Sequence, residues 1–265
     1  MDFLIRPFAI VYRHRRLLFR SVATEMRHRY AGSLVGVLWV VVAPLLLLAL
    51  YALVYAVIFR IRPLDMSTAD YVLRISCGLM PLLGFNEALA TGTTSLSLNK
   101  QVLLNTVFPS ELVPLRAVIA GSASSVAGLL MVLIGAAILH GPSFTFLAVP
   151  VVLFCQLMLV AGVAWILSLA NLVLRDIQQV LSFLTIVLLV ASPVAYTPAM
   201  LPASLSPFIY CNPLSYFVIA FQNVIADDVL PRPIVVTGLL VLGLLALTLG
   251  FEVFRRAKQV FFDYA

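Results

Sequence analysis

The sequence predicts an all-α integral membrane protein with six transmembrane helices. Hydrophobic residues make up 63% of the 265 residues and charged residues only 11%, whereas a soluble domain contains about 25% charged residues. Residues 34–59 form a run of 26 residues without a charge. As an α-helix this run would be about 39 Å long, enough to cross a hydrocarbon core of about 30 Å. It is the first predicted span.

The residues before this span indicate its direction. Arg27 and Arg29 lie just upstream, and basic residues near the end of a span are retained on the cytoplasmic side. Residues 1–33 are therefore expected in the cytoplasm. Their arginines are spread along the segment, and no short apolar region ends in a small-residue cleavage site, so we do not expect a cleavable signal peptide.

Residues 1–33 are instead predicted to form an amphipathic helix at the membrane interface. Apolar side chains would enter the acyl region of the membrane lipids, and arginines would lie among their headgroups. A basic flank that only sets the topology and a docking surface for a partner both fit this pattern. The apolar side comprises Phe8, Val11, Tyr12, Leu18, Phe19, Val22 and Met26, and the basic side Arg13, Arg16, Arg20 and Arg27.

Residues 71–91 form the second predicted span, which carries Arg74 and Glu87. Ionisable groups are costly at membrane depth and usually face protein or water. Because Arg74 lies near the outer end and Glu87 near the inner end, we interpret both as interfacial residues.

A polar segment follows and is expected in the cytoplasm. Within it, residues 99–107 could form a short helix, which Pro109 would keep from continuing into the next span. Val102 and Leu103 beside Lys100 would make this helix weakly amphipathic. An ordinary surface loop is the alternative.

The rest of the chain contains four more predicted spans. The third span includes the small residues of 121–128, which permit close contact between helices. The apolar stretch 214–226 is too short to cross a bilayer, so residues 205–228 are predicted to form a re-entrant or interfacial element on the outer side. The spans are expected at 117–139, 144–169, 180–196 and 234–251.

The distribution of basic residues supports this topology. Of the 17 arginines and lysines, 13 fall on the predicted inner side and three on the outer side, and Arg74 lies at a span end. This asymmetry favours six spans with both termini in the cytoplasm. It also accounts for the pI of about 9.5 without any binding of nucleic acid.

Motifs for catalysis or metal binding are absent from the sequence. Neither Lys100 nor Lys258 follows a glycine, so the chain cannot hydrolyse ATP with a P-loop of its own. The three cysteines and the lone loop residue His140 show no metal-ligand spacing. Asp227 and Asp228 are interpreted as residues of a solvated loop and not as a catalytic pair. We therefore expect no catalytic residue, metal site or cofactor in this chain, and its energy source would have to be separate.

Several segments resemble the type-2 ABC transporter permeases that export O-antigen, capsular polysaccharide and teichoic acid. Residues 29–39, RYAGSLVGVLW, are similar to the family's R-Y-x-x-S-x-L-G-x-x-W motif, with Val35 in place of leucine. Residues 105–114, NTVFPSELVP, are similar to its F-P-x-E-x-x-P loop. Further similarities follow in the family's order at Arg175-Asp176, Ser192-Pro-Val-Ala-Tyr196 and Asn212-Pro213-Leu214.

The chain departs from the family pattern at one place. Many members carry an arginine roughly where Phe221, Gln222 and Asn223 stand. A role that depends on this arginine is therefore not expected here.

The resemblance implies that residues 34–265 form a type-2 ABC transmembrane domain of a multi-pass protein in the bacterial inner membrane. It also implies a homodimer bound to two copies of a separate ABC ATPase, which would bind ATP and Mg²⁺. In such exporters a coupling helix in the first cytoplasmic loop contacts the ATPase, so residues 99–114 gain this role. The candidate coupling residues are Asn99, Lys100, Val102, Leu103, Pro109 and Glu111.

The resemblance further implies a channel for a lipid-linked polysaccharide. Aromatic rings suit such a path because they stack on sugar faces without fixing the register. An aromatic belt at the membrane interface is the alternative for these residues. The candidates are Tyr51, Tyr55 and Phe59, spaced by four on the first span, and Tyr196, Tyr210 and Tyr216 near the outer mouth.

Two other functions fit parts of the sequence. A type-2 ABC permease for a lipid or a drug would share the fold. A membrane-embedded transferase would need clustered acids or histidines at one membrane surface, whereas the 11 acidic residues are widely scattered.

Overall fold

The computed structural model describes residues 2–54, 66–100, 103, 108–174, 176–194, 209 and 211–263. Within these ranges every regular element is a helix, as predicted. The elements are α1 (Asp2–Arg13), α2 (Arg15–Arg29), η1 (Gly36–Leu38), α3 (Trp39–Leu53), α4 (Thr68–Leu98), α6 (Leu112–His140), η3 (Phe144–Ala148), α7 (Val149–Val173), α8 (Ile177–Ala191), α10 (Pro213–Ile225) and α11 (Pro233–Asp263).

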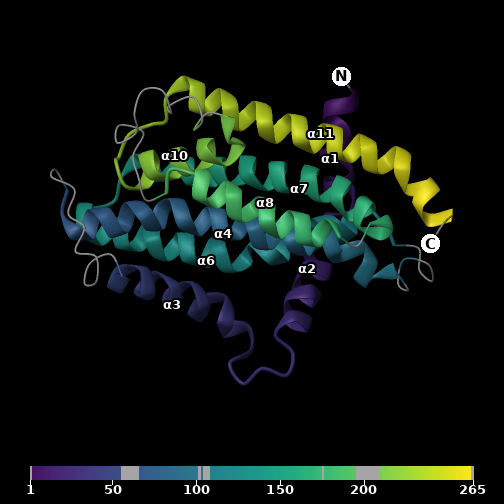
Figure 1. The fold of residues 1–265 in the computed structure, drawn as a ribbon, viewed down its shortest axis with the longest axis horizontal. Helices are drawn as coiled ribbons and strands as arrows, with labels where there is room; N and C mark the ends of the chain where they lie inside the picture. The colour runs from purple at the N-terminus through teal and green to yellow at the C-terminus, as the bar shows by residue number, and fades with distance from the viewer. Residues whose placement is uncertain are drawn as a thin grey trace.

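The long helices form one bundle. Helices α3, α4, α6, α7, α8 and α11 run roughly side by side, whereas α1 and α2 cross the bundle near one end (Figure 1). The C-terminus, the C-terminal ends of α4 and α7 and the N-terminal ends of α6 and α8 lie at that same end. We call it the basic end because its elements carry Arg6, Arg13, Arg15, Arg16, Arg20, Lys100, Arg116, Arg255, Arg256 and Lys258.

Five helices among the described residues are long and apolar enough to cross a membrane. They cover Gly36–Leu53, Thr68–Leu98, Leu112–His140, Phe144–Val173 and Pro233–Lys258, and each coincides with a predicted span.

The other predicted span, 180–196, falls on α8. This helix has 15 residues and ends at Ala191. At about 1.5 Å per residue it is about 22 Å long, shorter than a hydrocarbon core of about 30 Å. A sixth crossing therefore stays a prediction.

The N-terminal segment is not one continuous helix. Residues 1–33 contain two helices, α1 and α2, separated by a single residue. Leu18 and Val22 are buried, whereas Tyr12 and Phe19 are 70% and 73% exposed. The single apolar side expected from a continuous helix is thus divided, and part of it packs against the bundle.

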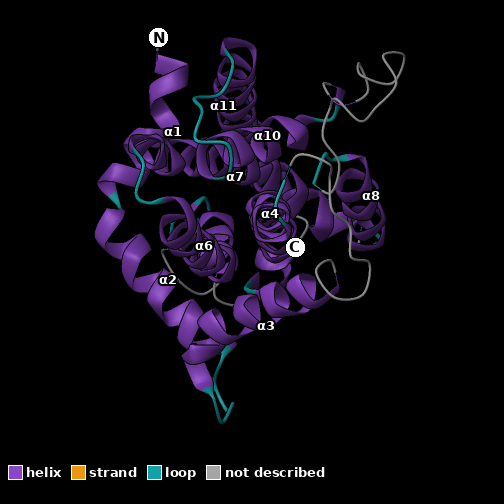
Figure 2. Ribbon diagram, turned by 90° about the vertical axis from the view of Figure 1, so that its left-hand side faces the viewer, coloured by secondary structure: helices purple, strands orange, loops and turns teal. Residues whose placement is uncertain are grey.

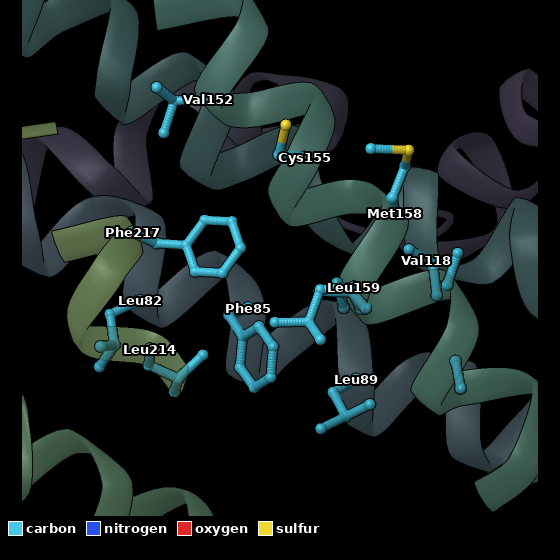
Figure 3. Packing of buried hydrophobic residues seen from close by; sticks show 14 of the residues in the cluster. Leu82, Phe85, Leu89, Val118, Val152, Cys155, Met158, Leu159, Leu214 and Phe217 are labelled. Atoms are coloured by element: carbon cyan, nitrogen blue, oxygen red, sulfur yellow. The ribbon is translucent and has the colours of Figure 1, made fainter. Parts of the chain in front are cut away.

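Helix α4 forms the centre of the core. It packs against α6, α7 and α10. Leu82, Phe85 and Leu89 of α4 lie close to Leu159 of α7 and Phe217 of α10 (Figure 3). The core thus joins the first and the last thirds of the chain.

Small residues bring α4 and α6 into close contact, as the third predicted span suggested. A Cβ atom on Gly121 would lie 2.9 Å from the Cα atom of Ala88, and one on Gly84 would lie 2.3 Å from the Cβ atom of Ser125. Side chains larger than hydrogen at these two glycines would push the helices apart.

Helix α10 covers part of the segment predicted to be re-entrant. Asn212 caps its N-terminus, because its side-chain oxygen accepts a hydrogen bond from the backbone N–H of Leu214 at 2.9 Å. Pro213 follows at the first helical position, where a missing N–H has no cost. Figure 2 shows α10 and α3 on opposite sides of α4. Re-entry into the membrane stays a prediction.

Candidate functional site

The segment expected to couple to an ATPase begins at the basic end, where α4 stops. Asn99 is the C-cap residue of α4, and its side-chain N–H donates to the carbonyl oxygen of Ser95 at 2.8 Å. Its side-chain oxygen accepts a hydrogen bond from Arg116 of α6 at 2.6 Å. The start of the segment is therefore fixed to the first turns of α6.

Arg116 has two further partners. Its Nε atom lies 3.5 Å from a carboxylate oxygen of Glu25 on α2. Its guanidinium carbon lies 5.6 Å from the ring centroid of Phe108, which precedes α6. One guanidinium thus joins α2, the end of α4 and both flanks of the segment.

The far end of the segment is held by Glu111. Its side chain is only 8% exposed and forms an ion pair with Lys258 of α11. Its carbonyl oxygen accepts a hydrogen bond from the indole N–H of Trp165 on α7 at 2.9 Å. The ring of Trp165 packs edge-on against Phe251 of α11, with centroids 5.3 Å apart. Glu111 therefore contacts α7 and α11 of its own chain.

The other predicted coupling residues lie between these two anchors. Lys100 is exposed, Pro109 is partly buried, and Leu103 is partly buried against the core. Val102 lies outside the described residues.

Sequence reasoning missed a third connection at the basic end. Asn171 of α7 is buried, and its side-chain N–H donates to the hydroxyl of Ser97 on α4 at 3.2 Å. Its side-chain oxygen accepts a hydrogen bond from Gln178 of α8 at 3.2 Å. An asparagine at the end of an apolar helix was the available signal, but its partners lie on two other helices.

The opposite end contains an ion pair that corrects the interpretation of Asp227 as a solvated residue. Arg74 of α4 donates to the carboxylate of Asp227, which follows α10. Their side chains are 14% and 27% exposed, so Asp227 is neither fully solvated nor unpaired. The adjacent Asp228 is exposed and accepts hydrogen bonds from Ser143 and from Thr145. These two bonds hold the pKa of Asp228 below its ordinary value.

Amide side chains from α10 contact the end of α8. The side-chain N–H of Gln222 donates to the carbonyl oxygens of Pro193 at 3.1 Å and Val194 at 3.2 Å. The side-chain N–H of Asn212 donates to the carbonyl oxygen of Leu188 at 3.1 Å. Pro193 and Val194 follow the last residue of α8, so Gln222 supplies a donor to carbonyl oxygens just beyond the helix. The carbonyl oxygen of Leu188 also accepts a hydrogen bond from the hydroxyl of Ser192 at 2.7 Å. Gln222 stands in the region where the resembling family commonly has arginine.

Of the aromatic residues predicted to line the channel, the structure describes Tyr51 and Tyr216, and these two are not in contact within one chain. Tyr51 on α3 is partly buried against the core, and Tyr216 on α10 packs its ring against Gly238 of α11. Helices α3 and α10 lie on opposite sides of α4 (Figure 2). The other four candidates, Tyr55, Phe59, Tyr196 and Tyr210, lie outside the described residues.

The described part of the chain contains no group of three or more His, Cys, Asp or Glu residues that could hold a metal ion.

Comparisons with known proteins extend over most of the chain. Residues 16–226 match the ABC-2 type transporter family. The chain is 25% identical over 261 residues to the O-antigen export system permease protein RfbA of Myxococcus xanthus, covering 97% of this chain and 98% of that protein. Two RfbA proteins of Klebsiella pneumoniae are 25% and 24% identical over 240 residues, covering 89% of this chain and 90% of each protein.

Proposed function

This chain belongs to the ABC-2 type transporter family, as its motifs suggested, and on that premise we propose that it is the permease subunit of a polysaccharide exporter. Its substrate would be a lipid-linked polysaccharide that crosses the bacterial inner membrane. The similarity to O-antigen export permeases over nearly the whole length of both chains supports this substrate class over a small lipid or a drug. A transport family also fits better than a membrane-embedded transferase.

The observation that carries the proposal is the anchoring of the segment between α4 and α6. Asn99 and Arg116 fix its start, and Glu111 with Lys258 and Trp165 fixes its end. A partner can alter a membrane bundle only through a contact that transmits movement. This segment is held to α2, α4, α6, α7 and α11, so a push on it would reach most of the bundle.

The proposed partner is a separate ABC ATPase, present in two copies and supplied with ATP and Mg²⁺. Lys100, Val102 and Leu103 would contact it, whereas Asn99, Pro109 and Glu111 would hold the contact segment in place. The basic end would face the cytoplasm, in keeping with the positive-inside rule. Helices α1 and α2 would contact membrane lipids with their exposed arginines and aromatic residues.

A second copy of the chain would complete the channel. Helices α3 and α8 expose large apolar side chains, among them Leu46, Leu50, Phe183 and Val187, and such faces are available to a second copy. Tyr51, Tyr55 and Phe59 would line the path on α3. Tyr196, Tyr210 and Tyr216 would lie near its outer mouth, where the packing of Tyr216 against Gly238 leaves it only partly exposed.

The test is to tag the chain, extract it gently from native membranes and identify its partners by mass spectrometry. We expect an ABC ATPase at equal stoichiometry. Leu103→Glu should abolish co-purification of the ATPase, and Lys100→Glu should reduce the amount that co-purifies. Val229→Glu is the control, because Val229 is 57% exposed and lies between α10 and α11 at the opposite end.

Two results would contradict the proposal. One is purification of the unmodified chain alone under conditions in which a control ABC complex survives. The other is an ATPase that stays bound to Leu103→Glu and Lys100→Glu variants that elute as intact protein in size-exclusion chromatography.

A further inference from the structure

Helix α2 presents a continuous face to the bundle. Leu18 and Val22 are buried on it. Glu25 and Arg29 follow at intervals of three and four residues, so they continue the same face. The side of α2 that meets the bundle is therefore apolar in its first half and charged in its second half.

The two charged residues on this face have partners of opposite sign on different helices. Glu25 pairs with Arg116 of α6 at 3.5 Å, and Arg29 pairs with Glu87 of α4 at 2.8 Å. Rotating or shifting α2 by one turn would bring like charges together, so this alternation selects one position of the helix. Ion pairs near the surface each contribute little free energy, but together these two fix the orientation of α2 as well as its attachment.

Arg116 differs from the other three charges because it also holds the segment between α4 and α6. It donates to Asn99 at the start of that segment and packs against Phe108 near its end. Its planar guanidinium donates to Asn99 through one terminal nitrogen while its Nε atom faces Glu25 at ion-pair distance. A lysine has a single ammonium group and could not reproduce this geometry.

The other end of α2 leads directly into the first long span. Gly32 and Gly36 have φ angles of +80° and +59°, which turn the chain between α2 and α3. The hydroxyl of Ser33 accepts hydrogen bonds from the indole N–H of Trp39 at 3.1 Å and from the backbone N–H of Gly36 at 3.3 Å. This short, internally bonded turn makes α3 follow a displacement of α2.

We propose that Arg116 is a positioning residue through which movement of the segment between α4 and α6 reaches α2, and that α2 passes this movement to α3. The ion pair with Glu25 is the mechanical link. The inference rests on the proposed function, in which that segment receives the stroke of the ATPase. It adds a route that leaves the first turns of α6 through Arg116, passes along α2 and acts on the span that carries Tyr51.

Charge reversal tests this link in the complex with its ATPase. Glu25→Arg and Arg116→Glu should each lower polysaccharide export about threefold to thirtyfold, the range expected for a coupling contact. ATP hydrolysis and co-purification of the ATPase should persist in Glu25→Arg, which leaves the bond between Arg116 and Asn99 in place. The double variant Glu25→Arg/Arg116→Glu should recover much of the export, although the bond to Asn99 is not restored. Ala23→Arg places the same new side chain on the exposed face of α2 and should export normally.

A second experiment covers the case in which the reversed variants fail to assemble. Cys77, Cys155 and Cys211 are replaced by alanine, and Glu25→Cys/Arg116→Cys is joined by a short bifunctional thiol reagent. We expect export to be low without the reagent and to rise after crosslinking, because the covalent bridge replaces the ion pair.

Two results would overturn the inference. One is normal export by both single reversals. The other is a crosslinked protein that binds its ATPase yet exports no better than the uncrosslinked one. Absence of any ATPase from the unmodified complex would instead defeat the proposed function, so the two failures are distinguishable.

Discussion

Gly162 of α7 and Gly250 of α11 face each other so closely that a Cβ atom on Gly250 would lie 2.0 Å from the carbonyl oxygen of Gly162. The contact involves backbone on both sides, so it cannot be relieved by rotating a side chain. The two helices are therefore held at their present distance by the absence of side chains at these positions.

Replacing Gly250 by alanine should force α7 and α11 apart. Overpacking of this kind costs about 1–3 kcal/mol, and the thermal unfolding temperature of the purified protein should fall. Gly135→Ala on α6 is the matched control, because a Cβ atom there meets no heavy atom within 4 Å. It should be neutral or stabilising by up to about 1 kcal/mol, since alanine favours helix more than glycine does. Equal effects of the two substitutions would contradict the packing argument.

The ion pair between Glu111 and Lys258 predicts an asymmetric response to substitution. Lys258→Met leaves a carboxylate that is 8% exposed without its counter-charge, and an unsatisfied buried group costs about 1–3 kcal/mol. The double variant Glu111→Gln/Lys258→Met should be less destabilised than Lys258→Met alone. Thermal unfolding of the three proteins measures this difference. If the double variant were the least stable of the three proteins, the destabilisation by Lys258→Met could not be caused by the uncompensated charge of Glu111.

Gln222→Leu should loosen the end of α8. The substitution removes the donor to the carbonyl oxygens of Pro193 and Val194, and buried acceptors without a donor cost about 1–3 kcal/mol. We expect faster hydrogen exchange at the amides of residues 188–192 and a lower unfolding temperature. Gln179→Leu makes the same change on the exposed start of α8 and should leave both measurements unchanged.

The hydrogen bonds to Asp228 predict a contribution to stability that depends on pH. They lower its pKa in the folded protein, so the unfolded chain takes up a proton first as the pH falls. The contribution is complete above the ordinary pKa of about 3.9 and disappears as the pH drops through the lower folded value. Asp228→Asn should therefore be less stable than the unmodified protein at pH 6, with a difference that shrinks below about pH 4. A difference that stays constant between pH 3 and pH 6 would rule this out.

The long helices other than α4 were predictable because each contains a continuous apolar run. Their ends were less predictable. Helix α11 continues beyond the predicted boundary at residue 251, because Glu252 bonds to Arg255 and Arg256 one turn later and Lys258 reaches Glu111. Charges that pair within a helix extend it past the apolar run that identifies it.

The polar contacts of the site could not be read from the sequence. Arg74 and Asp227 are 153 residues apart in the chain, and nothing local marks them as partners. The end of α8 at Ala191, before the predicted boundary at residue 196, also depends on contacts with residues distant in the sequence. The amides that bond to the carbonyl oxygens of Leu188 and Pro193 belong to Asn212 and Gln222, which lie 24 and 29 residues away in the chain. The motif at residues 105–114 pointed to the segment proposed for coupling, whereas the residues that hold this segment in place depend on tertiary packing.

The contrast between α3 and α4 has a consequence for biosynthesis. Helix α3 is strongly apolar and is the least buried of the five long helices, so it loses little if it enters the bilayer before the rest of the chain is made. Helix α4 is the least apolar and the most buried of the five, and its Arg74 and Glu87 find their partners on other segments. During synthesis Arg74 therefore has no counter-charge until Asp227, near the end of the chain, has been made. A chain that ends before this point would leave Arg74 without its counter-charge, although α6 and α7 would already be present to pack against α4.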